Sequence, residues 1–277
     1  MARHSRLRPH WSMPPVTAAQ RDAALHALGP RHWALLGLLA EHGVLDTSQV
    51  TRLLFDSRPT AVRHLGTLVR AGLVGRFVYG TDRTHLASYE ATAAGLRAVE
   101  QRLRQQGRPV PAMLGREPSE VNEFFARLAA APQGHLYRWR RRVDTVTWLG
   151  DHDIRGVRPQ AYGVWVEQGV AVRFLLHVDH HEPSPSAETP PPPPARALAG
   201  YRDVPRGVPV TAILVLARSA VREHELHQAL AVAALPVTVA ATTWSRYGQA
   251  VSPAEAIWSV AGADPAAHVR LAELPAN

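Results

Sequence analysis

Hydrophobic residues at helical spacing dominate the first part of the chain. In residues 30–42 the leucines are spaced as in a buried helix, which should end at Gly43. Asp46 is followed three residues later by Gln49, a pairing typical of a capping box. This pair predicts a second, short helix with one apolar stripe that ends near residue 55.

The next segment, residues 57–71, has the sharpest division between apolar and polar positions. Its apolar set is Val62, Leu65, Leu68 and Val69, and its polar set is Thr60, Arg63, His64, Thr67 and Arg70. Pro59 stands in the expected first turn, and Gly72 follows the expected end. The pattern predicts an amphipathic helix whose polar face carries only cationic and hydrogen-bonding groups.

A hairpin and a further helix follow this segment. Alternating positions predict strands at residues 73–79 and 85–90, and helical spacing predicts a helix at residues 91–105. Helix, helix, basic helix and hairpin is the order of a winged helix-turn-helix domain, in which the third helix enters the major groove of DNA. We therefore expect such a domain at residues 30–106, preceded by a flexible basic arm at residues 1–29.

This layout predicts which side chains contact duplex DNA. Arginine pairs with guanine edges, threonine and histidine contact bases or phosphates, and a wing contacts the sugar-phosphate backbone. The expected DNA-binding residues are Arg58, Thr60, Arg63, His64, Thr67 and Arg70 on the helix and Arg76, Arg83 and His85 on the hairpin. For any single one of them the alternative is a solvated surface side chain.

The second half of the chain predicts a mixed domain at residues 118–247, after a linker at residues 107–117. Its expected elements are a helix at 119–131, strands at 136–148, 162–167 and 170–179 with a tight turn at Gln168 and Gly169, a helix at 195–201, a strand at 210–216, a helix at 219–234 and a strand at 236–243. This order indicates an α/β domain of the restriction-endonuclease-like kind, so the whole chain combines α+β and α/β parts. Residues 183–194 are rich in proline and should form an extended loop, and residues 248–277 should form a C-terminal tail.

The distribution of charge points to one class of partner. All 31 basic residues are arginine, and the net charge of +8 arises in residues 1–110, which hold 15 arginines and 7 acidic residues. Residues 111–277 hold 16 of each kind. An arginine surplus concentrated in one domain is typical of polyanion binding, so double-stranded DNA is the expected partner.

Absent residue types and motifs exclude other classes. The chain has no cysteine, which excludes disulfide scaffolds, zinc fingers, iron–sulfur clusters and cysteine nucleophiles. It has no P-loop, dinucleotide-binding fingerprint or nucleophile elbow, and we expect no cofactor. No apolar run is long enough to cross a bilayer and the chain does not start like a signal peptide, so we expect a cytoplasmic protein with no membrane partner.

Several ordered blocks of this sequence together resemble the actinobacterial replication-relaxation family. The blocks are residues 31–39, 47–55, 71–74, 121–128 (VNEFFARL), 158–165 (RPQAYGVW) and 174–179 (FLLHVD). The resemblance covers most of the chain, about residues 30–243. It implies a DNA-binding bacterial protein of plasmid or mobile-element replication, transfer or transcriptional control.

The chain departs from this family at the residues that resemble a catalytic site. Family members often show Arg-Pro-Asp, then Leu-Glu-x-Asp and a later lysine, a set that resembles a Mg²⁺-dependent nuclease site. In this chain Gln160 stands at the first Asp position and His177 at the Glu position, so that Asp179 alone remains. The chain has no lysine, and an arginine near Tyr201 cannot act as a neutral base. We therefore expect a degenerate site and no enzymatic activity.

Two other interpretations of the sequence stay open. His177, Asp179 and His181 would share one face of a strand and could hold a transition metal, which would make the protein a divergent metal-dependent nuclease. Alternatively, the chain could be a protein-interaction adaptor with a vestigial winged helix. A homodimer, or a complex with replication or transfer proteins, is compatible with each interpretation, but no interface can be identified from the sequence.

Overall fold

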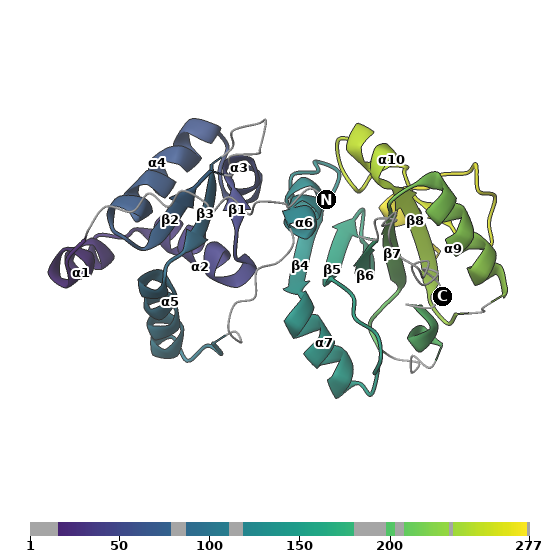
Figure 1. Ribbon diagram of the computed structural model, residues 1–277, viewed down its shortest axis with the longest axis horizontal. Coiled ribbons are helices and arrows are strands. Elements are labelled where there is room, and N and C mark those ends of the chain that lie inside the picture. Colours follow the sequence, from purple (N-terminus) through teal and green to yellow (C-terminus); the bar gives the residue numbers. More distant parts are fainter. Residues whose placement is uncertain are drawn as a thin grey trace, which may run out of the picture. The chain divides into compact units, whose positions relative to one another are not determined.

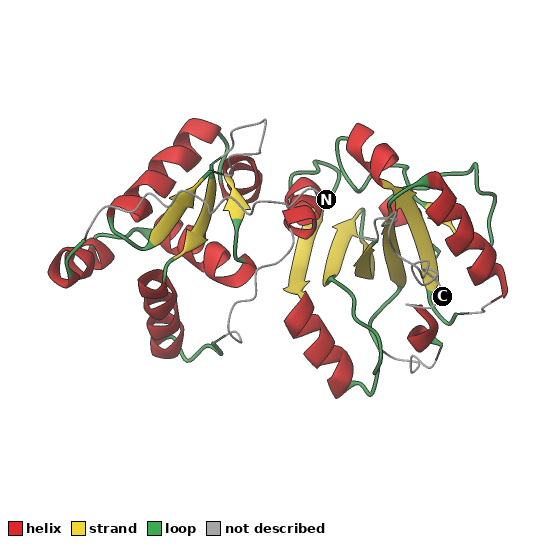
Figure 2. Ribbon diagram, in the orientation of Figure 1, coloured by secondary structure: helices red, strands yellow, loops and turns green. Residues whose placement is uncertain are grey.

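The computed structural model describes residues 16–78, 87–110, 119–179, 198–202, 208–232 and 235–275. The chain divides into two compact units, Met1–Ala126 and Arg127–Asn277. Helices and strands occur in both units (Figure 2). None of the helices in the described ranges is long and apolar enough to cross a membrane.

The first unit consists of helices packed around a small antiparallel sheet (Figure 1). Its helices are α1 (Ala18–His26), α2 (Pro30–His42), α3 (Thr47–Leu54), α4 (Arg58–Arg70) and α5 (Ala93–Gln105), and its strands are β1 (Leu45–Asp46), β2 (Val74–Phe77) and β3 (Ser88–Ala91). The sheet has the order β1-β3-β2. Helix α6 (Ser119–Ala129) spans the division between the units. The predicted order of three helices, hairpin and helix is confirmed.

Local signals explain where these helices begin and end. Helix α2 has Pro30 in its first turn and ends at Gly43, whose φ of 74° suits a residue without a Cβ. The Asp46 side chain accepts hydrogen bonds from the backbone N–H groups of Ser48 and Gln49, as the predicted capping box requires. Ser57 precedes α4 but does not cap it with its side chain.

The core of the first unit is formed by buried leucines of α2 and α4. Leu35, Leu36, Leu39, Leu65 and Leu68 are each fully buried. They belong to one hydrophobic cluster that also includes residues of β1, β2 and β3. Burial of this apolar surface fixes the orientation of α4, because its leucines must face α2 and the sheet.

Two elements of this unit were not expected from the sequence. Helix α1 lies inside the predicted arm, where Thr17 and Gln20 form a capping box. It carries no fully buried residue, so hydrophobic spacing did not indicate it. Strand β1 pairs with β3 through only two residues, which is too short for an alternating pattern to show.

The division between the units lies later in the chain than the expected domain boundary. The Asn122 side-chain amide of α6 donates hydrogen bonds to the backbone carbonyls of Val44 (2.8 Å) and His42 (3.2 Å). Arg52 of α3 forms a 2.6 Å ion pair with Glu123. These bonds attach the first turns of α6 to the first unit.

The second unit is built on a six-stranded sheet of order β4-β5-β6-β7-β8-β9. Its strands are β4 (His135–Arg141), β5 (Ala161–Glu167), β6 (Val170–Val178), β7 (Ala212–Ala217), β8 (Thr238–Thr243) and β9 (Ser259–Val260), and its helical elements are α7 (Arg142–Asp151), η1 (Ala199–Tyr201), α9 (Ala220–Val232), α10 (Trp244–Gln249) and η2 (Leu271–Glu273). Strands β4, β5 and β6 are antiparallel, β6, β7 and β8 are parallel, and β9 is antiparallel to β8. Every residue of β7 and β8 is buried, as expected for the central strands of a covered parallel sheet.

The predicted hairpin between β5 and β6 is confirmed. Gln168 and Gly169 connect the strands, with φ values of 50° and 82°. Two successive positive φ values suit a two-residue turn that follows the twist of the strands.

Two predictions about the second unit were wrong. The strand expected at residues 136–148 ends at Arg141, after which α7 begins. Thr145 and Leu149, one helical turn apart, are its buried residues, and the Thr145 hydroxyl donates to the Arg141 carbonyl at 2.7 Å. The arginines at positions 138 and 140–142 gave the sequence an alternating pattern, so the helical spacing of Thr145 and Leu149 was not recognised.

The second error concerns the C-terminal segment, residues 248–277. It is not a tail, because β9 closes the edge of the sheet against β8. Trp258 and Leu271 are fully buried, and the Trp258 indole donates to the Pro253 carbonyl at 2.7 Å. Few residues of this segment form regular structure, so periodicity could not reveal it. The proline-rich residues 183–194 lie outside the described ranges.

Candidate nucleic-acid interface

Helix α4 has one buried face and one exposed, cationic face. Ala61, Leu65 and Leu68 are fully buried. Arg63 and Arg70, one at mid-helix and one in the last turn, are exposed. The packing of the buried face therefore holds two guanidinium groups toward solvent.

A shallow hollow of about 390 Å³ lies between α4 and the strands of the hairpin. It is lined by Thr47, Arg58, Val62, Gly66, Val69, Arg76, Ala87 and Tyr89. The structure thus brings together Arg58 and Arg76, which the sequence assigned to the helix and to the hairpin. Both arginines are exposed, and they border the same hollow.

Val62, which the sequence pattern groups with the apolar residues of this helix, is exposed. Its side chain is 45% exposed and lines the hollow together with Gly66. Arg58, Val62 and Gly66 are spaced four residues apart and so follow one row along the helix. That spacing was the signal that could have placed Val62 and Gly66 on the outer surface.

The hydroxyl groups of α4 make local hydrogen bonds. Thr67 donates to the Arg63 carbonyl at 3.2 Å and accepts from the Arg70 guanidinium at 3.3 Å. Thr60 accepts from the Ser57 hydroxyl at 3.0 Å. Both threonines are only partly exposed, and Thr67 alone is bonded to an arginine side chain of this helix in the described contacts.

His64 lies elsewhere than predicted. Its ring stacks on Phe55 with centroids 5.0 Å apart and lies 4.5 Å from the ring of His32. Burial, together with the nearby charges of Arg63 and Arg31, lowers the pKa of His64 below its ordinary value. The lowered pKa keeps the ring neutral near pH 7. The ring packs against the rings of Phe55 and His32.

The four arginines of this surface have no acidic partner in the described part of the chain. No ion pair is present there for Arg58, Arg63, Arg70 or Arg76. We define these four residues as the basic surface. The other two predicted contacts, Arg83 and His85, lie outside the described residues.

The second unit brings together the three positions expected to form a degenerate nuclease site. Gln160 precedes β5, His177 lies in β6, and Asp179 follows β6. The Gln160 side chain accepts from the Val178 N–H at 3.0 Å and lies 3.4 Å from the Val178 carbonyl. It therefore extends the pairing of β5 with β6 and does not face an open site.

His177 and Asp179 are also engaged within the protein. The His177 Nε2 atom lies 2.8 Å from the hydroxyl of Tyr201, and their rings meet edge to face. Asp179 accepts a 3.0 Å hydrogen bond from Nε of Arg222 on α9. A guanidinium thus stands where a carboxylate-bound cation would have to lie.

Burial controls the protonation of this pair of rings. It lowers the pKa of His177 to about 4 and raises the pKa of Tyr201 far above its ordinary value. At neutral pH both groups are uncharged. Neither can supply the negative charge that Mg²⁺ requires.

Gln160, His177 and Asp179 do not form a Mg²⁺ site among the described residues. One carboxylate remains, and it is paired with an arginine. Among the described residues, no group of three histidine or acidic side chains could hold a metal ion. His181, the third residue of the alternative transition-metal site, lies outside these residues.

Comparisons with solved structures match about a third of the chain. The chain is similar to the MepR–DNA complex of Staphylococcus aureus, with 24% identity over 32% of this chain and 74% of that chain and a TM-score of 0.29. It is also similar to NadR in complex with 4-hydroxyphenylacetate, with 24% identity over 32% of this chain and 75% of that chain and a TM-score of 0.26. At these TM-scores we derive no function from either likeness. No curated protein matches the chain.

A family model covers a much larger part of the sequence. The model described as replication-relaxation matches residues 36–208, which is more than half of the chain. The match includes α3, α4, β5 and β6, and so contains the basic surface and the Gln160, His177 and Asp179 positions. The chain belongs to the replication-relaxation family.

Proposed function

We propose that the protein binds duplex DNA through α4 and the adjoining hairpin. The observation that carries this proposal is the basic surface, four exposed arginines on α4 and β2 without acidic partners in the described part of the chain. Unpaired guanidinium groups on a rigid helix can replace the counterions of DNA without first breaking an ion pair. Membership of the replication-relaxation family supports a role on DNA.

The positions of the side chains suggest separate roles. Arg63 and Arg70 project from the exposed face of α4 and would enter the major groove, where arginine can pair with guanine edges. Val62 offers an apolar contact for a thymine methyl group. Arg58 and Arg76 flank the hollow beside the helix and would contact phosphates. His64 contributes by packing and makes no DNA contact in this proposal.

The second unit, in this proposal, is restriction-endonuclease-like in fold and has no catalytic activity. Its antiparallel strands β4, β5 and β6, followed by the parallel strand β7, agree with such a fold. The Asp179–Arg222 pair argues against cation binding at the family's nuclease position. The unit would then act in DNA clamping or in contacts with other proteins of plasmid or mobile-element replication, transfer or transcriptional control.

Two sets of binding measurements on the full chain test the DNA-binding proposal. Fluorescence anisotropy with labelled duplex DNA at low salt should show binding. Replacing Arg63 and Arg70 together by alanine should weaken it by about 10- to 100-fold, because two contacts with the polyanion are lost.

A matched variant separates position from total charge. Arg97 and Arg104 lie on α5, outside the basic surface, and their replacement by alanine removes the same charge from the same unit. This variant should bind DNA within about threefold of the unchanged protein if the basic surface makes the contacts. Equal weakening by both double variants would leave only a general charge effect and would reject the proposed surface.

The divergent-nuclease and adaptor alternatives make opposite predictions. A nuclease would cut supercoiled plasmid in the presence of Mg²⁺ or Mn²⁺, and Asp179→Ala would abolish the cutting. An adaptor with a vestigial winged helix would show no salt-sensitive affinity for duplex DNA. We expect intact plasmid with either metal and DNA affinity that falls with salt.

A further inference from the structure

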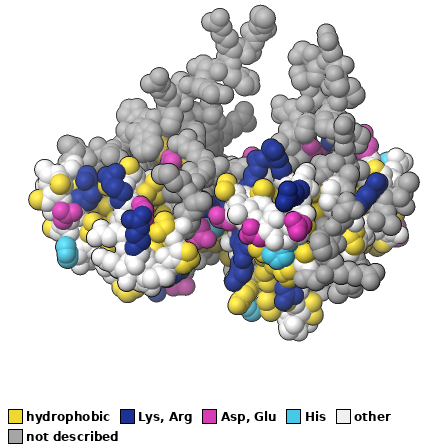
Figure 3. All heavy atoms as spheres, turned by 90° about the horizontal axis from the view of Figure 1, so that it is seen from below, with side chains coloured by type: hydrophobic (Ala, Val, Ile, Leu, Met, Phe, Trp, Pro, Cys, Tyr) yellow, Lys and Arg dark blue, Asp and Glu magenta, His cyan; other side chains and the backbone are white. Residues whose placement is uncertain are grey.

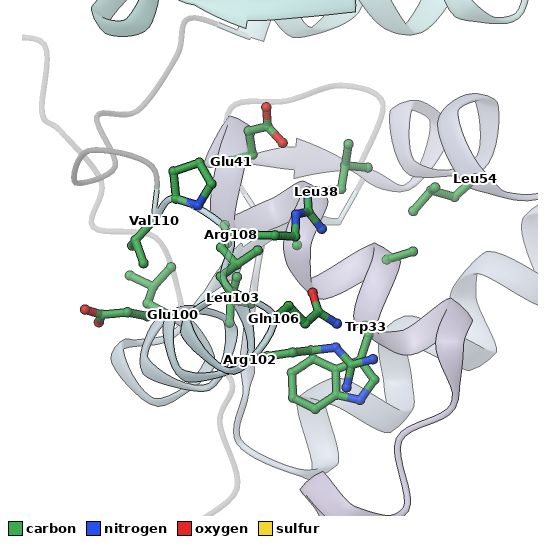
Figure 4. A pocket seen from close by; sticks show the side chains of 16 residues that line it. Trp33, Leu38, Glu41, Leu54, Glu100, Arg102, Leu103, Gln106, Arg108 and Val110 are labelled. Carbon is green, nitrogen blue, oxygen red and sulfur yellow. The ribbon is translucent and has the colours of Figure 1, made fainter.

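An open pocket of about 760 Å³ lies in the first unit between α2 and α5 (Figure 4). Its floor and walls are largely apolar, with contributions from Trp33, Leu38, Leu96, Val99 and Leu103. A volume of this size matches the pockets in which proteins bind small organic molecules. The pocket contains none of the four arginines of the basic surface, so DNA binding does not account for it.

Two arginines and a glutamine supply positive charge and hydrogen-bond donors to the lining of this pocket. The Arg102 guanidinium lies over the Trp33 ring, 4.5 Å from its centroid. Figure 4 shows the Arg102 guanidinium beside Trp33 and the Arg108 guanidinium beside Leu38, with the Gln106 amide between them. They supply amide and guanidinium donors beside an aromatic wall.

The acidic residues of the pocket do not neutralise these arginines. The pocket is lined by two acidic residues, Glu41 and Glu100. Glu100 forms an ion pair with Arg104, and in Figure 4 the carboxylates of Glu41 and Glu100 point away from Arg102. In the described ranges neither Arg102 nor Arg108 forms an ion pair. On the surface of the first unit, arginine side chains stand directly beside hydrophobic ones (Figure 3).

We propose that this pocket binds an amphipathic organic anion, a small molecule with an aromatic or aliphatic body and a carboxylate or sulfonate group. The body would lie against Trp33 and the leucine and valine side chains. The anionic group would lie between Arg102 and Arg108, where it would accept a charge-assisted and therefore strong hydrogen bond from one guanidinium and be attracted by the other. This inference does not depend on the DNA-binding proposal.

Charge complementarity selects this class of ligand over others. A cationic ligand would meet the Arg102 and Arg108 guanidinium groups, while the carboxylates of Glu41 and Glu100 point away from Arg102 (Figure 4). A neutral ligand would bury the apolar surface but would leave the two guanidinium groups without an anionic partner. An amphipathic anion would cover the apolar lining of the pocket and would also pair with a guanidinium group.

The test uses three probes that share one apolar body, namely naphthylacetate, naphthylacetamide and naphthylethylamine. Isothermal titration calorimetry of the full chain should show the acid binding at least about tenfold more tightly than the amide or the amine. Arg102→Ala and Arg108→Ala should each weaken naphthylacetate binding by about tenfold and leave the weak amide binding unchanged.

Arg104→Ala provides the matched control. It removes one positive charge from the same helix, but Arg104 does not line the pocket and instead pairs with Glu100. This variant should bind naphthylacetate as the unchanged protein does. The proposal fails if no probe binds, if the three probes bind equally, or if naphthylacetate binding is the same in the Arg102→Ala and Arg108→Ala variants as in Arg104→Ala.

Discussion

The Asp179 side chain has a structural role, because it forms a largely buried ion pair with Arg222. Its side chain is 8% exposed and its partner Arg222 is 15% exposed, so their ion pair is largely shielded from water. Arg222 also forms a 3.1 Å ion pair with Glu225, whose side chain is 47% exposed. Among the described residues, the same guanidinium therefore pairs with one buried and one exposed carboxylate.

Separate replacement of Asp179 and Glu225 measures how much each ion pair with Arg222 contributes to the free energy of unfolding. Asp179→Ala should lower the free energy of unfolding by about 2 kcal/mol, because it leaves a shielded guanidinium without its buried partner. Glu225→Ala should change it by less than about 0.5 kcal/mol, because exposed ion pairs contribute little. Urea unfolding at neutral pH measures both values, and equal effects would contradict the structural role of Asp179.

His177 should make stability depend on pH in a defined direction. Its pKa in the folded protein is about 4, below the ordinary value of 6.5, so the unfolded chain binds more protons between these two values. Stability is therefore complete above about pH 6.5 and falls as the pH drops toward 4.

Replacing His177 separates its contribution to the pH dependence of stability from the contributions of the other histidines. Burial also lowers the pKa of His32, His64 and His227, which act in the same direction. Between pH 7 and pH 5 the unchanged protein should lose about 2 kcal/mol more unfolding free energy than His177→Gln, as one proton linkage over this interval requires. Equal losses in the two proteins would show that His177 is not shifted.

At the scale of elements, the close packing of α5 against the start of β2 depends on a glycine. A Cβ built on Gly95 would collide with the Leu73 carbonyl and press on the Leu36 side chain. At Gly37, in the middle of α2, the position that such a Cβ would take has nothing within 4 Å. A side chain at residue 95 is therefore obstructed by its surroundings, whereas a side chain at residue 37 is not.

Gly95→Ala should cost about 3 kcal/mol of unfolding free energy, because a backbone carbonyl must move. Gly37→Ala should instead add roughly 0.5–1 kcal/mol, because alanine favours the helix and nothing obstructs it. Thermal or urea unfolding compares the two. A neutral Gly95→Ala variant would mean that α5 does not pack as described.

Elements with a strong local signal could be predicted from the sequence. The Asp46–Gln49 capping box, the leucine spacing of α2 and the Gln168–Gly169 turn each depend on residues close together in the chain. The strands that were missed depend on distant partners. Strand β9 exists through pairing with β8, and β1 exists through pairing with β3.

The candidate sites could be predicted in part for the same reason. Helical spacing placed Arg63 and Arg70 on the exposed face of α4, because that face follows from the buried leucines. It could not show that Phe55 and His32 receive the ring of His64. Nor could it show that Arg222, more than forty residues after Asp179, pairs with that carboxylate.

At the scale of the whole molecule, charge is divided unequally along the sequence. Residues 1–110 carry the whole net charge of +8, and residues 111–277 are neutral. The basic surface lies in the charged part, and the Asp179–Arg222 pair lies in the neutral part. The proposed DNA affinity should therefore come from the first unit and should be strongly sensitive to salt.

The most direct measurement of this claim is the salt dependence of DNA binding by the full chain and by the Arg63→Ala, Arg70→Ala double variant. We predict that the logarithm of the binding constant falls linearly with the logarithm of salt concentration. The slope of the double variant should be shallower by about 2, since two cationic contacts with the polyanion are lost. The Arg97→Ala, Arg104→Ala control should keep the original slope. A slope that is the same in all three proteins, or an absence of binding at low salt, would contradict DNA binding through the basic surface.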